Sequence, residues 1–275
     1  MKKLKSIIIY FIFPVAIIAL TVAGYPMFLL IVVPLYFTVF TIFQYENIRK
    51  IMAGYNSKRG KTNKALRHIY KAYKVKKSTV HTALAFIYML LRAGKYDKSG
   101  EIISETETRE MSEFESHQLK TNKALYLWKK NKITESLALY EELAKEGEST
   151  VLYGSYGYVL TLGDSLAKAL EVNEAAYKYN PNDKAIMDNL GLTYILVGDY
   201  DKAFDIYEKL LMKVPGFPEA YYNAAELMRL MKDYDTGVRY IKTCMTKPFN
   251  GLSTITEKDA QRKLDQLNRL QGSAQ

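Results

Sequence analysis

Few side chains in this 275-residue sequence have the type and spacing that catalysis or metal binding requires. A single cysteine, Cys244, excludes a disulfide framework and any zinc module built from several cysteines. The three histidines, His68, His81 and His117, are too scattered to form a metal-ligand motif. We therefore expect no metal site and no cofactor.

The short motifs of common enzymes are also missing from the sequence. It contains no Gly-x-x-x-x-Gly-Lys phosphate loop, no Gly-x-Ser-x-Gly elbow, no His-Glu-x-x-His pair and no Gly-x-Gly-x-x-Gly loop. This favours a protein without catalytic activity, and an enzyme with an unrecognised site is the alternative.

Basic charge is concentrated at the N-terminal end of the chain. The net charge is +10, yet the first 77 residues hold fourteen Lys and Arg and only one acidic residue, Glu46. The remainder holds 25 basic and 28 acidic residues and is mildly acidic. A nucleic-acid surface would have to lie in the first 77 residues, and no nucleic-acid partner is expected.

A long apolar stretch precedes this acidic part. From Ser6 to Phe43 the sequence has no charged residue, which is too long for one membrane span of about 20 residues and suits two. Gly24-Tyr25-Pro26 lies near its middle and can turn the chain. The stretch predicts a transmembrane hairpin within residues 1–45, with spans at about 7–23 and 27–43. One long tilted span or a re-entrant loop is the alternative.

The residues flanking the apolar stretch predict its orientation. Lysines precede the first span, Lys and Arg follow the second, and the connection carries no charge. The positive-inside rule then places both termini and the body in the cytoplasm, at a cell membrane that the two spans cross. A cleaved signal peptide ending at Thr21-Val22-Ala23 is the competing interpretation, and it would export the body. The compact plan, without a eukaryotic targeting motif, favours a bacterial source.

The rest of the chain repeats at about 34 residues. A small residue recurs at Ala65, Ser99, Ser136, Ala169, Ala203 and Gly237, and twelve residues earlier the chain has Ala53, Ile87, Ala124, Gly157, Gly191 and Ala225. Such recurrence predicts stacked helical pairs in which small residues allow two helices to cross closely.

One unit carries a fuller pattern. Leu190-Gly191, Tyr194, Ala203, Tyr207 and Pro215 are spaced as in the tetratricopeptide repeat (TPR), which this sequence resembles. The resemblance implies an all-α fold, a right-handed superhelical TPR solenoid after the N-terminal hairpin. It implies about six helical pairs over residues 46–251, the first three degenerate: 46–79, 80–116, 117–149, 150–183, 184–217 and 218–251. Residues 252–275 would form a capping helix, near 254–270, and a tail.

The resemblance also implies where a partner binds. In TPR arrays the first helix of each unit lines a concave groove, and the family's binding positions correspond here to Tyr88, Asn122, Trp128, Tyr158, Asn189, Tyr222 and Asn223. The Asn side chains suit an extended peptide backbone. Trp128 suits either an interface anchor or packing between repeats. The Arg and Lys that grip a carboxylate tail in some TPR co-chaperones are missing, so a protein or peptide partner of another kind is expected.

A basic face follows the second predicted span. Its members are Lys58, Arg59, Lys61, Lys64, Arg67, Lys71 and Lys74. Juxtamembrane clusters of this kind attract anionic lipids, although a solvated face that only enforces topology is the alternative. Together these features predict a membrane-tethered TPR scaffold or adaptor that recruits partners at the cytoplasmic face. The runner-up is an exported TPR protein of envelope assembly.

Overall fold

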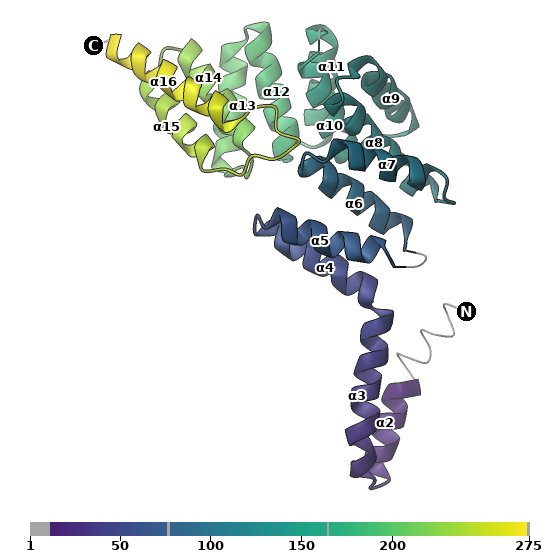
Figure 1. The fold of residues 1–275 in the computed structure, drawn as a ribbon. Helices are drawn as coiled ribbons and strands as arrows, with labels where there is room; N and C mark the ends of the chain where they lie inside the picture. Colours follow the sequence, from purple (N-terminus) through teal and green to yellow (C-terminus); the bar gives the residue numbers. More distant parts are fainter. Residues whose placement is uncertain (1–11, 76–77, 164, 274–275) are drawn as a thin grey trace. The chain divides into compact units, whose positions relative to one another are not determined.

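The computed structural model describes residues 12–75, 78–163 and 165–273, and these residues form helices and connecting turns without a β-strand (Figure 1). They divide into two compact units, residues 1–86 and 87–275. The first unit contains α2 (Phe13–Val22), α3 (Pro26–Phe43), α4 (Tyr45–Lys58), α5 (Thr62–Tyr73) and the start of α6 (Val80–Arg92).

The second unit contains the rest of α6 and ten further helices among the described residues. They are α7 (Tyr96–Glu107), α8 (Glu113–Lys129), α9 (Ile133–Glu146), α10 (Thr150–Thr161), α11 (Leu166–Tyr179), α12 (Lys184–Val197), α13 (Tyr200–Met212), α14 (Pro218–Leu230), α15 (Tyr234–Met245) and α16 (Glu257–Ser273). Helix α8 begins before the third predicted unit at residue 117, and α16 both begins and ends three residues later than the predicted capping helix.

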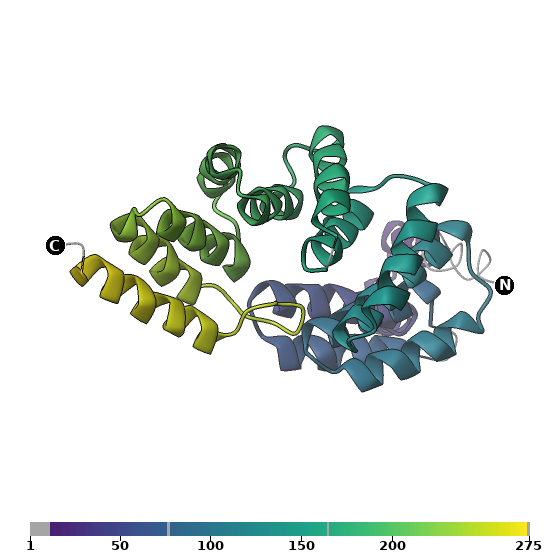
Figure 2. The same cartoon turned by 90° about the horizontal axis from the view of Figure 1, so that it is seen from above.

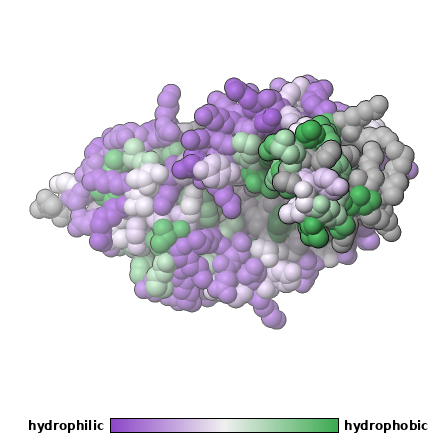
Figure 3. All heavy atoms as spheres, turned by 90° about the horizontal axis from the view of Figure 1, so that it is seen from below, coloured by the Kyte–Doolittle hydropathy of each residue, from purple (hydrophilic) through white to green (hydrophobic). Residues whose placement is uncertain are grey.

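In the first unit, α2 and α3 form an apolar helical hairpin. Gly24 in the turn has φ +78°, and Pro26 begins α3, so the break lies where the sequence predicts it. None of the residues of α2 is buried, and Figure 3 shows apolar side chains gathered on the surface of this unit. Residues 7–11 of the first predicted span lie outside the described residues.

The described helices do not support the expectation of two membrane spans. No single helix among them is both long and apolar enough to cross a bilayer. Leu29–Ile42 and Tyr45–Lys58, which are bent by 68° relative to each other, reach the required length and composition only as a pair.

Helices in the second unit pack in the order of the sequence. First helices pack on their own second helices in α8 with α9, α10 with α11, α12 with α13 and α14 with α15, and first helices also contact one another from α8 through α10 and α12 to α14. All twelve of the recurring positions are buried. At Gly191 an added Cβ would lie 2.7 Å from the Tyr207 ring, so only glycine lets these helices approach as they do.

Local signals explain where these helices begin and end. Ser112 and Glu115 form a reciprocal capping box at the start of α8, and Asp183, Asp199 and Asp233 accept backbone N–H groups at later starts. The turn between the helices of a pair repeatedly uses a left-handed backbone. It is found at Gly60, Gly94, Asn131, Gly198 and Lys232.

Among the described residues, two buried apolar clusters lie between the helices of the second unit. One is formed by α8 to α11 and is centred on Tyr140, Leu143 and Leu152. The other is formed by α12 to α16, where Leu267 of α16 is fully buried. Helix α16 therefore covers the end of the array, as a capping helix does.

Candidate partner-binding site

The first helices α8, α10, α12 and α14 present one continuous face, here called the first-helix face. Six of the seven predicted groove residues lie on these helices, and the seventh, Tyr88, lies on α6 with 43% of its surface exposed. These four helices contact one another in this order, and Figure 2 shows the ribbon of the unit that they belong to. The predicted residues differ in what they contact.

Trp128 and Tyr158 form an aromatic pair on this face. Their ring centroids are 5.6 Å apart in an edge-on arrangement, and Lys129 Nζ lies 4.2 Å from the Trp128 ring. Trp128 also packs against the core cluster of α8 to α11. The packing of Trp128 between repeats is thus observed, and its role as an interface anchor stays a prediction.

The three predicted asparagines are largely occupied within the protein. Asn189 Nδ2 donates to the Gly154 carbonyl at 2.9 Å, and Asn223 Nδ2 donates to Asp188 Oδ1 at 3.2 Å. Asn122 is 9% exposed. The amides of Asn189 and Asn223 thus link neighbouring first helices, and with 3% and 8% of their surface exposed they offer little to a peptide.

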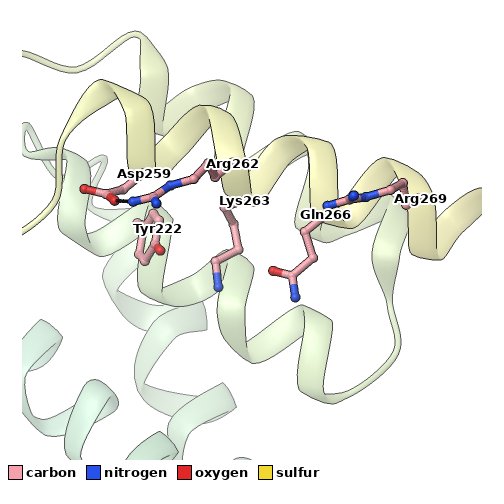
Figure 4. Close-up of a pocket in the computed structure, with 6 residues that line it drawn as sticks. All are labelled: Tyr222, Asp259, Arg262, Lys263, Gln266 and Arg269. Atoms are coloured by element: carbon pink, nitrogen blue, oxygen red, sulfur yellow. Dashed lines mark hydrogen bonds and ion pairs between the residues drawn. The ribbon is translucent and has the colours of Figure 1, made fainter.

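Tyr222 lies beneath the capping helix. Lys263 Nζ of α16 is 5.1 Å from its ring centroid, and a pocket of about 300 Å³ opens beside them, also lined by Asp259, Arg262 and Arg269 (Figure 4). Arg262 pairs with Asp259, and Lys263 pairs with Glu226 of α14. These contacts leave Tyr222 at the edge of the first-helix face rather than at its centre.

Two buried carboxylates on this face were not anticipated from the sequence. Asp188 is 3% exposed and accepts hydrogen bonds from Tyr207 Oη, at 2.9 Å, and from Asn223. Burial, and secondarily the charge of Glu219, raise the pKa of Asp188 to about 7. Glu219 is 8% exposed on the neighbouring α14. Two carboxyl groups are therefore enclosed in the first-helix face, and that of Asp188 keeps its proton up to about pH 7.

The segment between α15 and α16, Thr246–Thr256, contacts the same face and is here called the α15–α16 loop (Figures 1 and 2). Lys129 Nζ donates to the Ser253 carbonyl at 3.0 Å, and Thr254 N donates to Glu219 Oε1 at 3.2 Å. The hydroxyls of Tyr158 and Thr254 are also hydrogen-bonded. Burial lowers the pKa of Lys129, and the charge of Glu219 opposes that shift.

Nothing local in the sequence marks this loop as part of the site. Its residues follow the last repeat, and the repeat pattern assigns them to the end of that unit and the start of the cap. The available signal is its length, since the other links between described helices of the second unit are shorter. The family pattern does not predict Lys129 and Glu219 as site residues, because they do not occupy the binding positions that it implies.

Cys244 is fully buried in the core of α12 to α16, and burial, followed by the charge of Glu219, raises the pKa of its thiol to about 12. The thiol form is therefore favoured at neutral pH, which makes Cys244 an unreactive residue of this core. Among the described residues, no group of three or more His, Cys, Asp or Glu side chains is placed to hold a metal ion.

The predicted basic face lies on α4, on α5, in the turn between them and at Lys74, which follows the end of α5. All seven of its residues are exposed, and none pairs with a carboxylate within the part of the chain that the structure describes. Arg59 and Lys74 lie over the rings of Tyr55 and Tyr70. The pKa of nearby His68 is lowered first by burial and then by the charges of Arg49, Lys71 and Arg67, which shows a positive local potential.

Segments of this sequence are similar to segments of known proteins. Tetratricopeptide repeat protein 21A of Mus musculus is 28% identical over 130 residues, and the BBSome complex member BBS4 of Bos taurus is 29% identical over 90 residues. These matches cover 45% and 33% of this chain but only 9% and 17% of the two relatives. No family model matches the chain.

Solved structures share its architecture over more of its length. A TPR protein from Parabacteroides merdae superposes with a TM-score of 0.63 over 94% of this chain and 99% of its own, at 9% identity. A thermophilic TPR protein from Thermus thermophilus gives a TM-score of 0.56 over 70% of this chain and 100% of its own, at 18% identity. At such identities the likeness concerns the fold, and the chain is an all-α helical-repeat solenoid of the TPR type.

Proposed function

We propose that this chain is a scaffold that binds a segment of a partner protein on its first-helix face and has no catalytic activity of its own. The supporting observation is the combination at Trp128, Lys129, Tyr158 and Glu219, where an aromatic pair borders partly buried polar groups of both signs. Large aromatic side chains supply much of the binding energy at interfaces, and partly buried charges add specificity.

The binding proposal is tested by purifying the full-length chain in mild detergent and identifying the proteins that accompany it. Trp128→Ala should release a specific partner, because the substitution removes the aromatic anchor. Phe114→Ala is the control, since Phe114 lies on the same helix and is 69% exposed. If both variants keep every partner while their thermal unfolding remains cooperative, the first-helix face is not the binding surface.

The chain is further proposed to be tethered to a membrane by α2 and α3. Their apolar side chains are widely exposed, among them Ile18, Leu30 and Ile31 at 62%, 73% and 68%. The hydroxyls of Thr21, Thr38 and Thr41 donate to carbonyls four residues earlier in the same helix. Hydroxyls satisfied within their own helix need no water, which suits a hydrocarbon environment.

Membrane tethering is tested by washing isolated membranes at alkaline pH. The full-length chain should remain in the membrane, whereas a chain beginning at Gln44 should be released. Release of the full-length chain by the same wash would contradict insertion of the hairpin.

The finer proposal is a two-span hairpin with both termini and the repeats in the cytoplasm of a bacterial cell. The basic flanks support this orientation. Fused to Gln275, a reporter that is active only in the cytoplasm should give signal. Signal only from a reporter that is active outside the cytoplasm would instead favour the exported envelope-assembly protein.

A further inference from the structure

One peptide group of the α15–α16 loop lies between two side chains of opposite charge. The carbonyl of Ser253 accepts from Lys129 of α8, and the next N–H, that of Thr254, donates to Glu219 of α14. Both atoms belong to the same peptide bond, so its donor and its acceptor are satisfied at once. Any residue except proline at the second position can supply these groups, and the pair therefore recognises main chain rather than one side chain.

A glycine positions the loop for this contact. Gly251 N donates to the Arg92 carbonyl at 2.7 Å, and Tyr96 Oη donates to the Gly251 carbonyl at 2.5 Å. A Cβ at position 251 would lie 2.3 Å from Gly94 N and 2.4 Å from the Leu91 carbonyl oxygen. Because both neighbours are backbone atoms, a larger residue cannot be accommodated by a side-chain movement.

The loop also has the properties of a separable segment. Asn250 and Ser253 close a turn through hydrogen bonds within the loop itself. Phe249 and Ile255, on either side of the turn, pack against the core of α12 to α16. The contacts of the turn with the first-helix face are hydrogen bonds, which exchange readily for bonds to water or to another peptide. The turn can therefore leave without removing its flanking side chains from the core.

We propose that Lys129 and Glu219 are the peptide-recognition element of the first-helix face and that the α15–α16 loop is its resident occupant. The partner is a protein segment that forms the same turn, with glycine at the place of Gly251 and a small hydroxyl residue at that of Thr254, and it binds by displacing the loop. This inference rests on the proposed scaffold function. It adds the chemistry of the partner, and it predicts that the free protein binds the partner weakly, since only the fraction with a displaced loop is competent.

The first test uses a labelled synthetic peptide of residues 246–256 as the probe and the full-length protein in mild detergent. Gly251→Val should dislodge the resident loop and tighten binding of the added peptide by about tenfold or more. Gly216→Val is the matched control, because a Cβ there meets nothing within 4 Å. Adding Lys129→Met to Gly251→Val should abolish the gain. Emission of Trp128, the only tryptophan, reports binding beside Lys129.

A second measurement does not require a dislodged loop. In the otherwise native chain, Lys129→Met should speed hydrogen exchange at the Gly251 amide by about tenfold, because the loop loses one of its contacts. Lys123→Met, on the same helix but paired with Glu107, should leave that rate unchanged. Equal exchange in both variants would overturn the proposal, as would a folded Gly251→Val variant that binds the peptide no more tightly than the native chain.

These outcomes separate the inference from the function on which it rests. If natural partners depend on Trp128 but the peptide never binds, the resident-occupant proposal fails alone. If the peptide binds as expected but no partner depends on Trp128, the scaffold function fails alone.

Discussion

The side-chain oxygen of Asn173 lies so close to the backbone of Gly157 that a Cβ at position 157 would be 2.0 Å from it. Asn173 is fully buried between α10 and α12, and its Nδ2 donates to Thr161 and Thr193 at 2.8 and 2.9 Å. The glycine at the crossing thus leaves room for a polar network that joins two repeats.

We expect Gly157→Ala to destabilise the second unit by roughly 1–3 kcal/mol, because the methyl group must displace Asn173 from its hydrogen bonds. Gly154→Ala, on the same helix, meets only the Ala185 Cβ at 3.7 Å and should be neutral or stabilising by up to about 1 kcal/mol. Chemical denaturation of the two variants measures the difference. Equal stability would show that the Asn173 network is not strained by a methyl group.

Ser99 and Ser136 occupy the same repeat position and should respond in opposite directions to replacement by Ala. Ser136 Oγ donates to the Ala124 carbonyl at 2.8 Å, so Ser136→Ala should cost about 1 kcal/mol. The Ser99 hydroxyl is buried and has no hydrogen-bond partner among the residues that the structure describes, so Ser99→Ala should leave stability unchanged or raise it by up to about 1 kcal/mol. Thermal unfolding of both variants tests this prediction. A larger loss of stability in Ser99→Ala than in Ser136→Ala would contradict it.

Asp188→Asn should alter how stability depends on pH. The pKa of Asp188 is raised to about 7 in the folded protein, so between about pH 4 and 7 the folded state keeps a proton that the unfolded state releases. This carboxyl therefore lowers stability as pH rises through that range, by at most about 1.4 kcal/mol per pH unit.

The amide that this substitution introduces does not titrate, and its oxygen can still accept from Tyr207 and Asn223. The free energy of unfolding of Asp188→Asn, relative to that of the native protein, should therefore increase from pH 4 to 7. Above pH 7 this difference should stay constant. Unfolding free energies measured across this range decide the point. Asp201→Asn is the control for a carboxylate on the exposed side of α13, and the same slope in that variant would remove Asp188 as the cause.

The basic face should hold α5 against anionic lipid. In the full-length chain reconstituted into phosphatidylglycerol vesicles, amides of α5 should exchange more slowly than in phosphatidylcholine vesicles, and high salt should remove the difference. Replacing Lys64, Arg67 and Lys71 by Gln should weaken the interaction by about 1 kcal/mol per charge. A control with Lys145, Lys178 and Lys209 replaced by Gln removes equal charge from exposed positions elsewhere. If the amides of α5 exchange equally slowly in both triple variants, the basic face does not bind the lipid.

Much of the repeat architecture could be predicted because its determinants are local and periodic. Gly191, Ala203 and Tyr207 are close in the sequence, and the packing of one unit repeats in the next. The break between α2 and α3 was likewise predictable, since Gly24 and Pro26 act on their own backbone. Signals of this type depend on spacing alone.

The centre of the candidate site could not be predicted in the same way. Gly251 meets Gly94, and Ser253 meets Lys129, across most of the second unit, and no periodicity relates these positions. The pKa of Asp188 depends on burial by neighbouring helices and on Glu219, not on its own segment. The asparagines implied by the family pattern lie on the expected helices, but their hydrogen bonds depend on partners from other repeats.

The contact between Gly251 and Gly94 changes how this array can come apart. In an open solenoid each repeat touches only its neighbours, so the terminal repeats fray independently. Here the connection before the last helix is bonded to the turn that follows α6, so the two ends of the second unit share interactions. Unfolding of one end must break contacts of the other end. The first and last repeats of the second unit should therefore unfold cooperatively, and neither should unfold alone.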